Sequence, residues 1–140
     1  MEKTATGKGA GGAPGGNEPP PSRSDGGVIA VVDDDDGFRE SLGALIEAVG
    51  RQARLFASAD AFVGALATSS FACVFLDVHM PGLSEVAAVA AVRRIAPDLR
   101  IVSVSGRMEP GDRERMVAAG AAAFLEKPLS FKDIEALIGA

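Results

Sequence analysis

The chain has 140 residues, a net charge of −5 and one cysteine, Cys73, in an apolar run. An internal disulfide is therefore impossible, and we expect Cys73 to be a buried, inert thiol. No basic stripe, signal-peptide core or run of membrane-spanning length is visible, which argues against direct nucleic-acid binding, secretion and membrane insertion and predicts a cytoplasmic protein.

Residues 1–27 form a distinct N-terminal segment that holds eight of the 17 glycines and four of the eight prolines. The segment contains almost no large apolar side chain, so it cannot bury enough surface to offset the entropy lost on folding. We therefore predict a disordered tail over 1–27 and one folded domain over 28–140.

From residue 28 onward, short apolar runs alternate with helical patterns. The runs 28–32, 52–56, 72–76, 100–104 and 122–125 predict strands, and the segments 38–49, 59–67, 84–95, 111–119 and 131–138 predict helices. Asp35 and Asp36 stand where the first helix should begin, because its dipole favours carboxylates there. Five such units predict an α/β fold, a doubly wound five-stranded parallel sheet of the flavodoxin-like (βα)5 type.

Polar residues follow four of the predicted strands. Asp33 and Asp34 come after the first strand, Asp77 after the third, Ser105 after the fourth and Lys127 after the fifth. Ligands of such sheets bind at the carboxyl ends of the strands, so these groups should converge. Carboxylates bind a hard divalent cation, most plausibly Mg²⁺, and one carboxylate, already ionised at pH 7, can attack phosphorus without a general base.

The motifs "VVDDDDGFRESL", "FLDVHMPGLS", "VSVSGR" and "FLEKP" resemble those of the receiver domain of two-component response regulators, the CheY-like family. "LFASADAFV" is similar to the receivers usually joined to LuxR-type DNA-binding domains. The resemblance covers essentially all of 28–140, with the site motifs in the same order. Each motif is weak by itself, but the set is specific.

The resemblance implies that Asp77 is the phosphoacceptor and that the cofactor is Mg²⁺. The metal ligands it implies are Asp33, Asp34, Asp77 and the backbone carbonyl of His79. Without the resemblance, His79 is a lone histidine that has no partner in a triad-like setting.

The resemblance also assigns catalytic roles to Ser105 and Lys127, which would hold the phosphoryl oxygens, with Lys127 paired to Asp77 at rest. Ser105 and Phe124 would change position with phosphorylation, although Phe124 could also be plain core. The bond between Lys127 and Pro128 is expected to be cis.

The implied function is phosphorelay signalling, with no separate substrate turnover. The implied partners are a histidine kinase or phosphotransfer protein and a downstream protein, and a homodimer could form through the face made by 111–119, 122–125 and 131–138. The chain ends after the last helix, which predicts a stand-alone receiver unless an output region is absent from it. Two alternatives stay open: an aspartyl-phosphate phosphohydrolase using the Asp-x-Asp spacing of Asp33 and Asp35, and a degenerate receiver that binds partners without phosphorylation.

Overall fold

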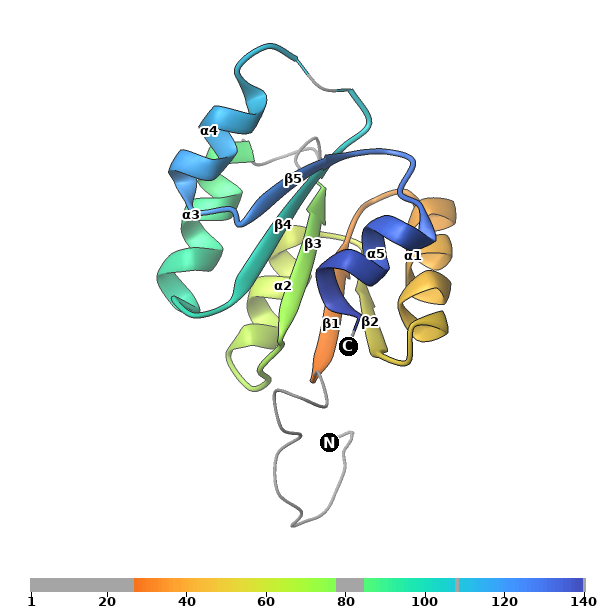
Figure 1. Ribbon diagram of the computed structural model, residues 1–140. Coiled ribbons are helices and arrows are strands. Elements are labelled where there is room, and N and C mark those ends of the chain that lie inside the picture. Colours follow the sequence, from red (N-terminus) through yellow and green to blue (C-terminus); the bar gives the residue numbers. More distant parts are fainter. Residues whose placement is uncertain (1–26, 78–84, 108, 140) are drawn as a thin grey trace.

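The computed structural model describes residues 27–77, 85–107 and 109–139 (Figure 1). The tail predicted over 1–27 therefore lies outside the described residues except for Gly27, and His79 lies outside them too. Among the described residues, no helix is long and apolar enough to cross a bilayer.

Strands and helices alternate along the described chain in the predicted order. They are β1 (Val28–Val32), α1 (Asp36–Ala48), β2 (Gln52–Phe56), α2 (Ala59–Leu66), β3 (Cys73–Asp77), α3 (Glu85–Ile95), β4 (Arg100–Ser105), α4 (Asp112–Ala119), β5 (Ala123–Glu126) and α5 (Phe131–Ile138). The five strands pair in parallel in the order β2-β1-β3-β4-β5. This is the doubly wound flavodoxin-like arrangement, so the predicted fold is confirmed.

Helices cover both faces of the sheet (Figure 1). A hydrophobic cluster lies between the sheet and the helices on each face. One cluster joins the sheet to α2, α3 and α4 and contains Phe62, Val89 and Met116. The other joins it to α1 and α5 and contains Leu42 and Ile134. Successive residues of β1 enter opposite clusters, as the pleat of a strand requires, and nearly all of the strand is buried.

Helix α1 begins at Asp36, two residues before the predicted helical segment 38–49, because Asp35 supplies its N-cap. The Asp35 side chain accepts a hydrogen bond of 3.2 Å from the amide of Phe38, which satisfies one of the free N–H groups of the first turn. The prediction that Asp35 and Asp36 start this helix is confirmed. Asp77 and Ser105 were predicted to follow their strands, but they are the last residues of β3 and β4.

Arg93, in the last turn of α3, ties several connections together. Its guanidinium donates hydrogen bonds to the carbonyls of Pro97 at 2.7 Å, Leu99 at 2.5 Å and Gly120 at 2.8 Å. Gly120 ends α4 with φ at 119°, a left-handed conformation that glycine adopts without strain. One side chain therefore fastens the end of α3 to the end of α4 and to the start of β4.

Candidate functional site

The candidate site lies where the strand order reverses. β1 lies between β2 and β3 in the sheet, so the connections from its carboxyl end and from that of β3 leave on opposite faces. A crevice outside the strand ends is the usual ligand site of such sheets. Val32 is paired with Leu76, which places the next residues, Asp33 and Asp77, side by side at this edge.

Three carboxylates meet at this edge. Asp33, Asp34 and Asp77 each offer one oxygen, and these oxygens lie within 4.8 Å of one another. Asp33 and Asp77 are only 1% and 6% exposed, whereas Asp34 is exposed. Carboxylates held this close in a buried place repel one another unless cations neutralise them. We call these three residues the acidic cluster.

The charge and the oxygen atoms of the acidic cluster suit a divalent cation. Oδ1 of Asp33 accepts the amide of Asp35 at 2.8 Å, but the fully buried Oδ2 accepts no well-formed hydrogen bond among the described residues. The ammonium of Lys127 at 2.8 Å is the recorded ion-pair partner of Oδ2. Three carboxylates against one ammonium leave an excess of negative charge, and oxygen ligands of this type fit Mg²⁺.

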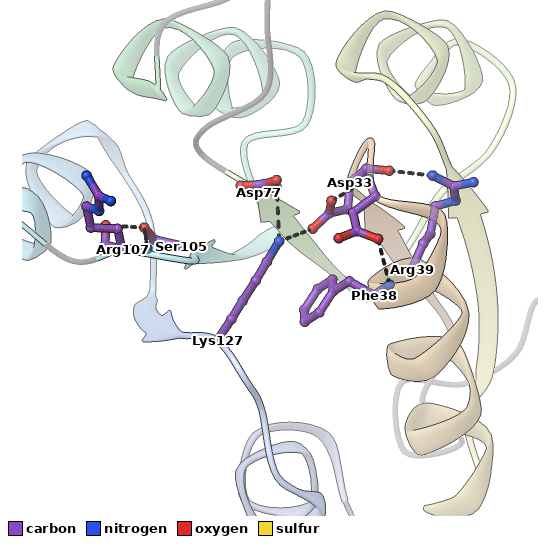
Figure 2. A network of polar contacts seen from close by, with 8 residues as sticks. Asp33, Phe38, Arg39, Asp77, Ser105, Arg107 and Lys127 are labelled. Atoms are coloured by element: carbon purple, nitrogen blue, oxygen red, sulfur yellow. Dashed lines mark hydrogen bonds and ion pairs between the residues drawn. The ribbon is translucent and has the colours of Figure 1, made fainter.

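Lys127 follows β5 and reaches into the acidic cluster (Figure 2). Its Nζ lies 2.8 Å from Oδ2 of Asp33 and 3.6 Å from Oδ2 of Asp77. Burial by itself would lower the pKa of Lys127, but the close polar contact with the Asp33 carboxylate and the charges of Asp77, Asp33 and Asp35 outweigh it and raise the pKa above its ordinary value. The ammonium is therefore charged at every physiological pH. The bond between Lys127 and Pro128 is cis.

Two further residues of α1 support the acidic cluster, and sequence reasoning did not assign either to the site. Arg39 donates to the backbone carbonyl of Asp33 at 2.7 Å and forms an ion pair with Asp36. The ring centroid of Phe38 lies 4.2 Å from Nζ of Lys127. From the sequence, Phe38 is placed only at the start of the predicted helical segment 38–49. Its position three residues after the capping Asp35 is the sequence signal that places it beside the strand ends.

Ser105 is fully buried at the end of β4, and its hydroxyl serves its own loop. Oγ donates to the carbonyl of Arg107 at 2.5 Å and accepts the amide of Arg107 at 3.0 Å (Figure 2). The backbone carbonyl of Ser105 accepts the amide of Lys127 at 2.7 Å, which ties the ends of β4 and β5 together. The hydroxyl has one proton, so it has to release the Arg107 carbonyl before it can donate to another group.

Phe124 lies in β5 and is 1% exposed, so its ring is packed inward. Arg113 of α4 donates to the Phe124 carbonyl at 3.2 Å, and its guanidinium carbon lies 6.0 Å from the centre of the ring. The aromatic residue that the sequence nominated as a switch is thus in contact with α4.

Comparison with known proteins agrees with this geometry. Residues 29–139 match the family model of the response regulator receiver domain, so the chain belongs to the response regulator receiver family. Membership places it in two-component signalling, and the family consists of signalling domains in general rather than enzymes that turn over a substrate.

Two curated relatives illustrate the similarity. The transcriptional regulatory protein FixJ of Bradyrhizobium diazoefficiens is 35% identical over 100 residues, which are 71% of this chain and 49% of FixJ. The response regulator protein TodT of Pseudomonas putida is 31% identical over 101 residues, which are 72% of this chain and 43% of TodT. The chain thus spans about half the length of the curated relatives it matches.

Solved structures share the fold. The receiver domain of NtrX from Brucella abortus has a TM-score of 0.73 and 26% identity, and the match covers 78% of this chain and 92% of that one. A response regulator from Burkholderia pseudomallei, solved with a phosphorylated aspartic acid, calcium ion and citrate, has a TM-score of 0.73 and 24% identity over 81% of this chain and 67% of that one.

Proposed function

We propose that the domain receives a phosphoryl group on Asp77, with Mg²⁺ held by Asp33, Asp34 and Asp77, and changes its protein-binding surface in response. The observation that carries the proposal is the acidic cluster, whose oxygens lie within 4.8 Å of one another beside the Lys127 ammonium. The compartment, which the sequence predicts to be the cytoplasm, stays a prediction.

The chemistry assigned to Asp77 needs no proton transfer. Its carboxylate is ionised at neutral pH, so an oxygen can attack the phosphorus of a phosphohistidine on a histidine kinase or phosphotransfer protein. A P–O bond forms and the P–N bond breaks, with its electron pair staying on the histidine nitrogen. The ring leaves as neutral imidazole because its other nitrogen carries a proton. Lys127 lies 3.6 Å from Asp77 and neutralises charge as it builds up on the phosphoryl oxygens. Bound Mg²⁺ would supply further neutralisation and orient those oxygens.

The response to phosphorylation is assigned to Ser105, Phe124 and the helices that follow. Ser105 would exchange its bonds to Arg107 for a phosphoryl oxygen, which moves the loop before α4. Arg113 contacts Phe124, so a displacement of α4 reaches the aromatic ring. Val117 of α4 and Phe131 of α5 are 51% and 42% exposed, which offers apolar area for a downstream protein or a second copy on the face made by α4, β5 and α5.

The phosphohydrolase alternative is not favoured by the site. One oxygen of Asp33 accepts the Asp35 amide and the other lies 2.8 Å from the Lys127 ammonium, so Asp33 is poorly placed to attack a substrate. The Asp35 carboxylate accepts the Phe38 amide as the cap of α1, so it does not act together with Asp33 on a substrate. The Asp-x-Asp spacing therefore reflects a site residue followed by a helix cap.

The proposal is tested with a small acyl phosphate as donor, followed by intact mass. Wild type with Mg²⁺ should gain about 80 Da, one phosphoryl group. Asp77→Asn is the matched control, because it keeps the shape of the side chain and removes its nucleophilic charge. Absence of the gain in wild type, or an equal gain in Asp77→Asn, would contradict the proposal.

A further inference from the structure

The ring of Phe38 lies against the ammonium group that pairs with the acidic cluster. Phe38 is the third residue of α1, and its centroid is 4.2 Å from Nζ of Lys127. Figure 2 shows the ring extending from the first turn of the helix toward the Lys127 side chain. An ammonium at this distance over a ring is attracted by the negative charge of the π face, and more strongly where water is partly excluded. The Lys127 side chain is only 20% exposed.

The ring is fixed from two directions. The amide of Phe38 donates to the capping carboxylate of Asp35 at 3.2 Å, which sets the backbone of the first turn. The side chain packs against the core cluster of the α1 and α5 face, and it lines an apolar hollow together with Pro128 and Leu129. Pro128 follows Lys127 directly, so the ring and the segment that carries the lysine border the same hollow.

The other partners of the ammonium are anions that a metal ion can also claim. Oδ1 of Asp33 already accepts the Asp35 amide, whereas Oδ2 accepts no well-formed hydrogen bond among the described residues, so Oδ2 has the greater free capacity for a cation. Oδ2 of Asp33 is also closer to the Lys127 ammonium than Oδ2 of Asp77 is, at 2.8 Å against 3.6 Å. A divalent cation at the acidic cluster therefore competes with Lys127 for Asp33. The ring carries no charge and binds no hard metal ion, so its contact with the ammonium is independent of that competition.

We propose that Phe38 is a positioning residue that holds the Lys127 ammonium within reach of Asp77 when a cation takes Asp33. The inference rests on the proposed function of Asp77. This role differs from ordinary core packing. If Phe38 only filled space, an apolar side chain of similar size without a π face could replace it, and we expect that it cannot.

The test compares Phe38→Leu, which keeps apolar bulk and removes the ring, with Phe38→Tyr, which keeps the ring. Phe71→Leu is the matched control, because Phe71 also has a cation above its ring, Arg54 at 5.8 Å. Phe71 lies just before the first residue of β3, whereas Asp77 is the last residue of that strand. With a small acyl phosphate and saturating Mg²⁺, Phe38→Leu should acquire its phosphoryl group about fivefold more slowly. Phe38→Tyr and Phe71→Leu should keep the wild-type rate.

A second readout needs neither metal nor phosphorylation. In protein with isotope-labelled lysine, the methylene protons next to Nζ of Lys127 should show an upfield ring-current shift, which persists in Phe38→Tyr and disappears in Phe38→Leu. Absence of that shift in wild type overturns the inference. So does a wild-type phosphorylation rate in Phe38→Leu, or an equal slowing in Phe71→Leu. If wild type acquires no phosphoryl group, the proposed function fails, and the lysine shift alone decides whether Phe38 positions the ammonium.

Discussion

The ammonium of Lys127 lies closer to Asp33 than to Asp77, at 2.8 Å against 3.6 Å. Asp33 is the more buried of the two carboxylates, and among the described residues its Oδ2 accepts no well-formed hydrogen bond to compensate for the loss of water. A buried charge in this condition is costly, so the nearest cation is drawn to it. Lys127 therefore neutralises the acidic cluster through Asp33 and remains within reach of Asp77.

Removing one charge from the acidic cluster should stabilise the metal-free protein. Asp34→Asn relieves repulsion with Asp33 and Asp77, whose oxygens lie within 4.8 Å. Because Asp34 is exposed, we expect a gain of only about 0.5 kcal/mol in the free energy of unfolding in a chelator. Urea denaturation measures it. With Mg²⁺ the order should invert, since wild type gains more from the ion. Equal Mg²⁺ stabilisation of both proteins would contradict the metal assignment.

The cap of α1 should be a measurable part of the stability. Asp35→Ala removes the acceptor of the Phe38 amide and should cost about 1 kcal/mol of unfolding free energy. Asp36→Ala is the matched control, because Asp36 is also acidic but makes only an ion pair with Arg39 in the first turn. It should cost less than half as much in the same urea experiment. Equal losses would show that charge near the helix dipole, and not the cap, matters.

Cys73 gives a pH dependence with a defined sign. Burial raises the pKa of its thiol from 9.0 to about 11, and the charges of Arg100 and Arg51 offset only part of this effect. Between these values the unfolded chain loses the thiol proton and the folded chain keeps it. The free energy of unfolding should therefore fall as pH rises through this window, by up to about 3 kcal/mol from this group.

The control for that prediction is Cys73→Ala, which removes the thiol and should flatten this part of the pH profile measured by urea denaturation. Native wild type should also resist a thiol reagent at pH 8, whereas the unfolded chain reacts at once. Rapid labelling of the native protein, or identical pH profiles for the two proteins, would show that the thiol is not held neutral by burial.

Arg93 and its neighbour Arg94 offer a matched pair. Arg93→Lys cannot reproduce the fork of hydrogen bonds to Pro97, Leu99 and Gly120, and we expect a loss of about 2 kcal/mol of unfolding free energy. Arg94 is exposed at the next position, so Arg94→Lys should change the stability by less than about 0.5 kcal/mol. The two variants have the same composition and net charge. Equal effects would mean that the hydrogen bonds of Arg93 contribute no net stability.

The sequence predicted the fold well because apolar runs and caps are local signals. Asp35 caps α1 close to the expected start, and α5 covers the predicted segment 131–138, where Ser130 and Asp133 form a capping box. Parallel strands then bring Asp33 and Asp77 to one edge, because Val32 and Leu76 are in register. The strand order and register therefore decide which carboxylate residues meet at this edge.

What the sequence did not predict depends on side-chain direction. The hydroxyl of Ser105 turns to Arg107, Lys127 lies nearer to Asp33 than to Asp77, and Phe38 reaches the lysine as well as the core. For Lys127 and Phe38 the choice is decided by neighbours from distant parts of the chain, whereas for Ser105 it is decided by the conformation of the loop that begins at this residue. Periodicity along one helix or strand contains no information about them.

The central claim is that Asp77, and no other carboxylate of the acidic cluster, accepts the phosphoryl group. Reduction of the phosphorylated protein with borohydride cleaves an acyl phosphate and leaves an altered mass at the acceptor, which peptide mass spectrometry can locate. The account predicts one altered residue, Asp77, whose yield depends on Mg²⁺. An altered mass at Asp33 or Asp34, or none at any aspartate, would contradict it.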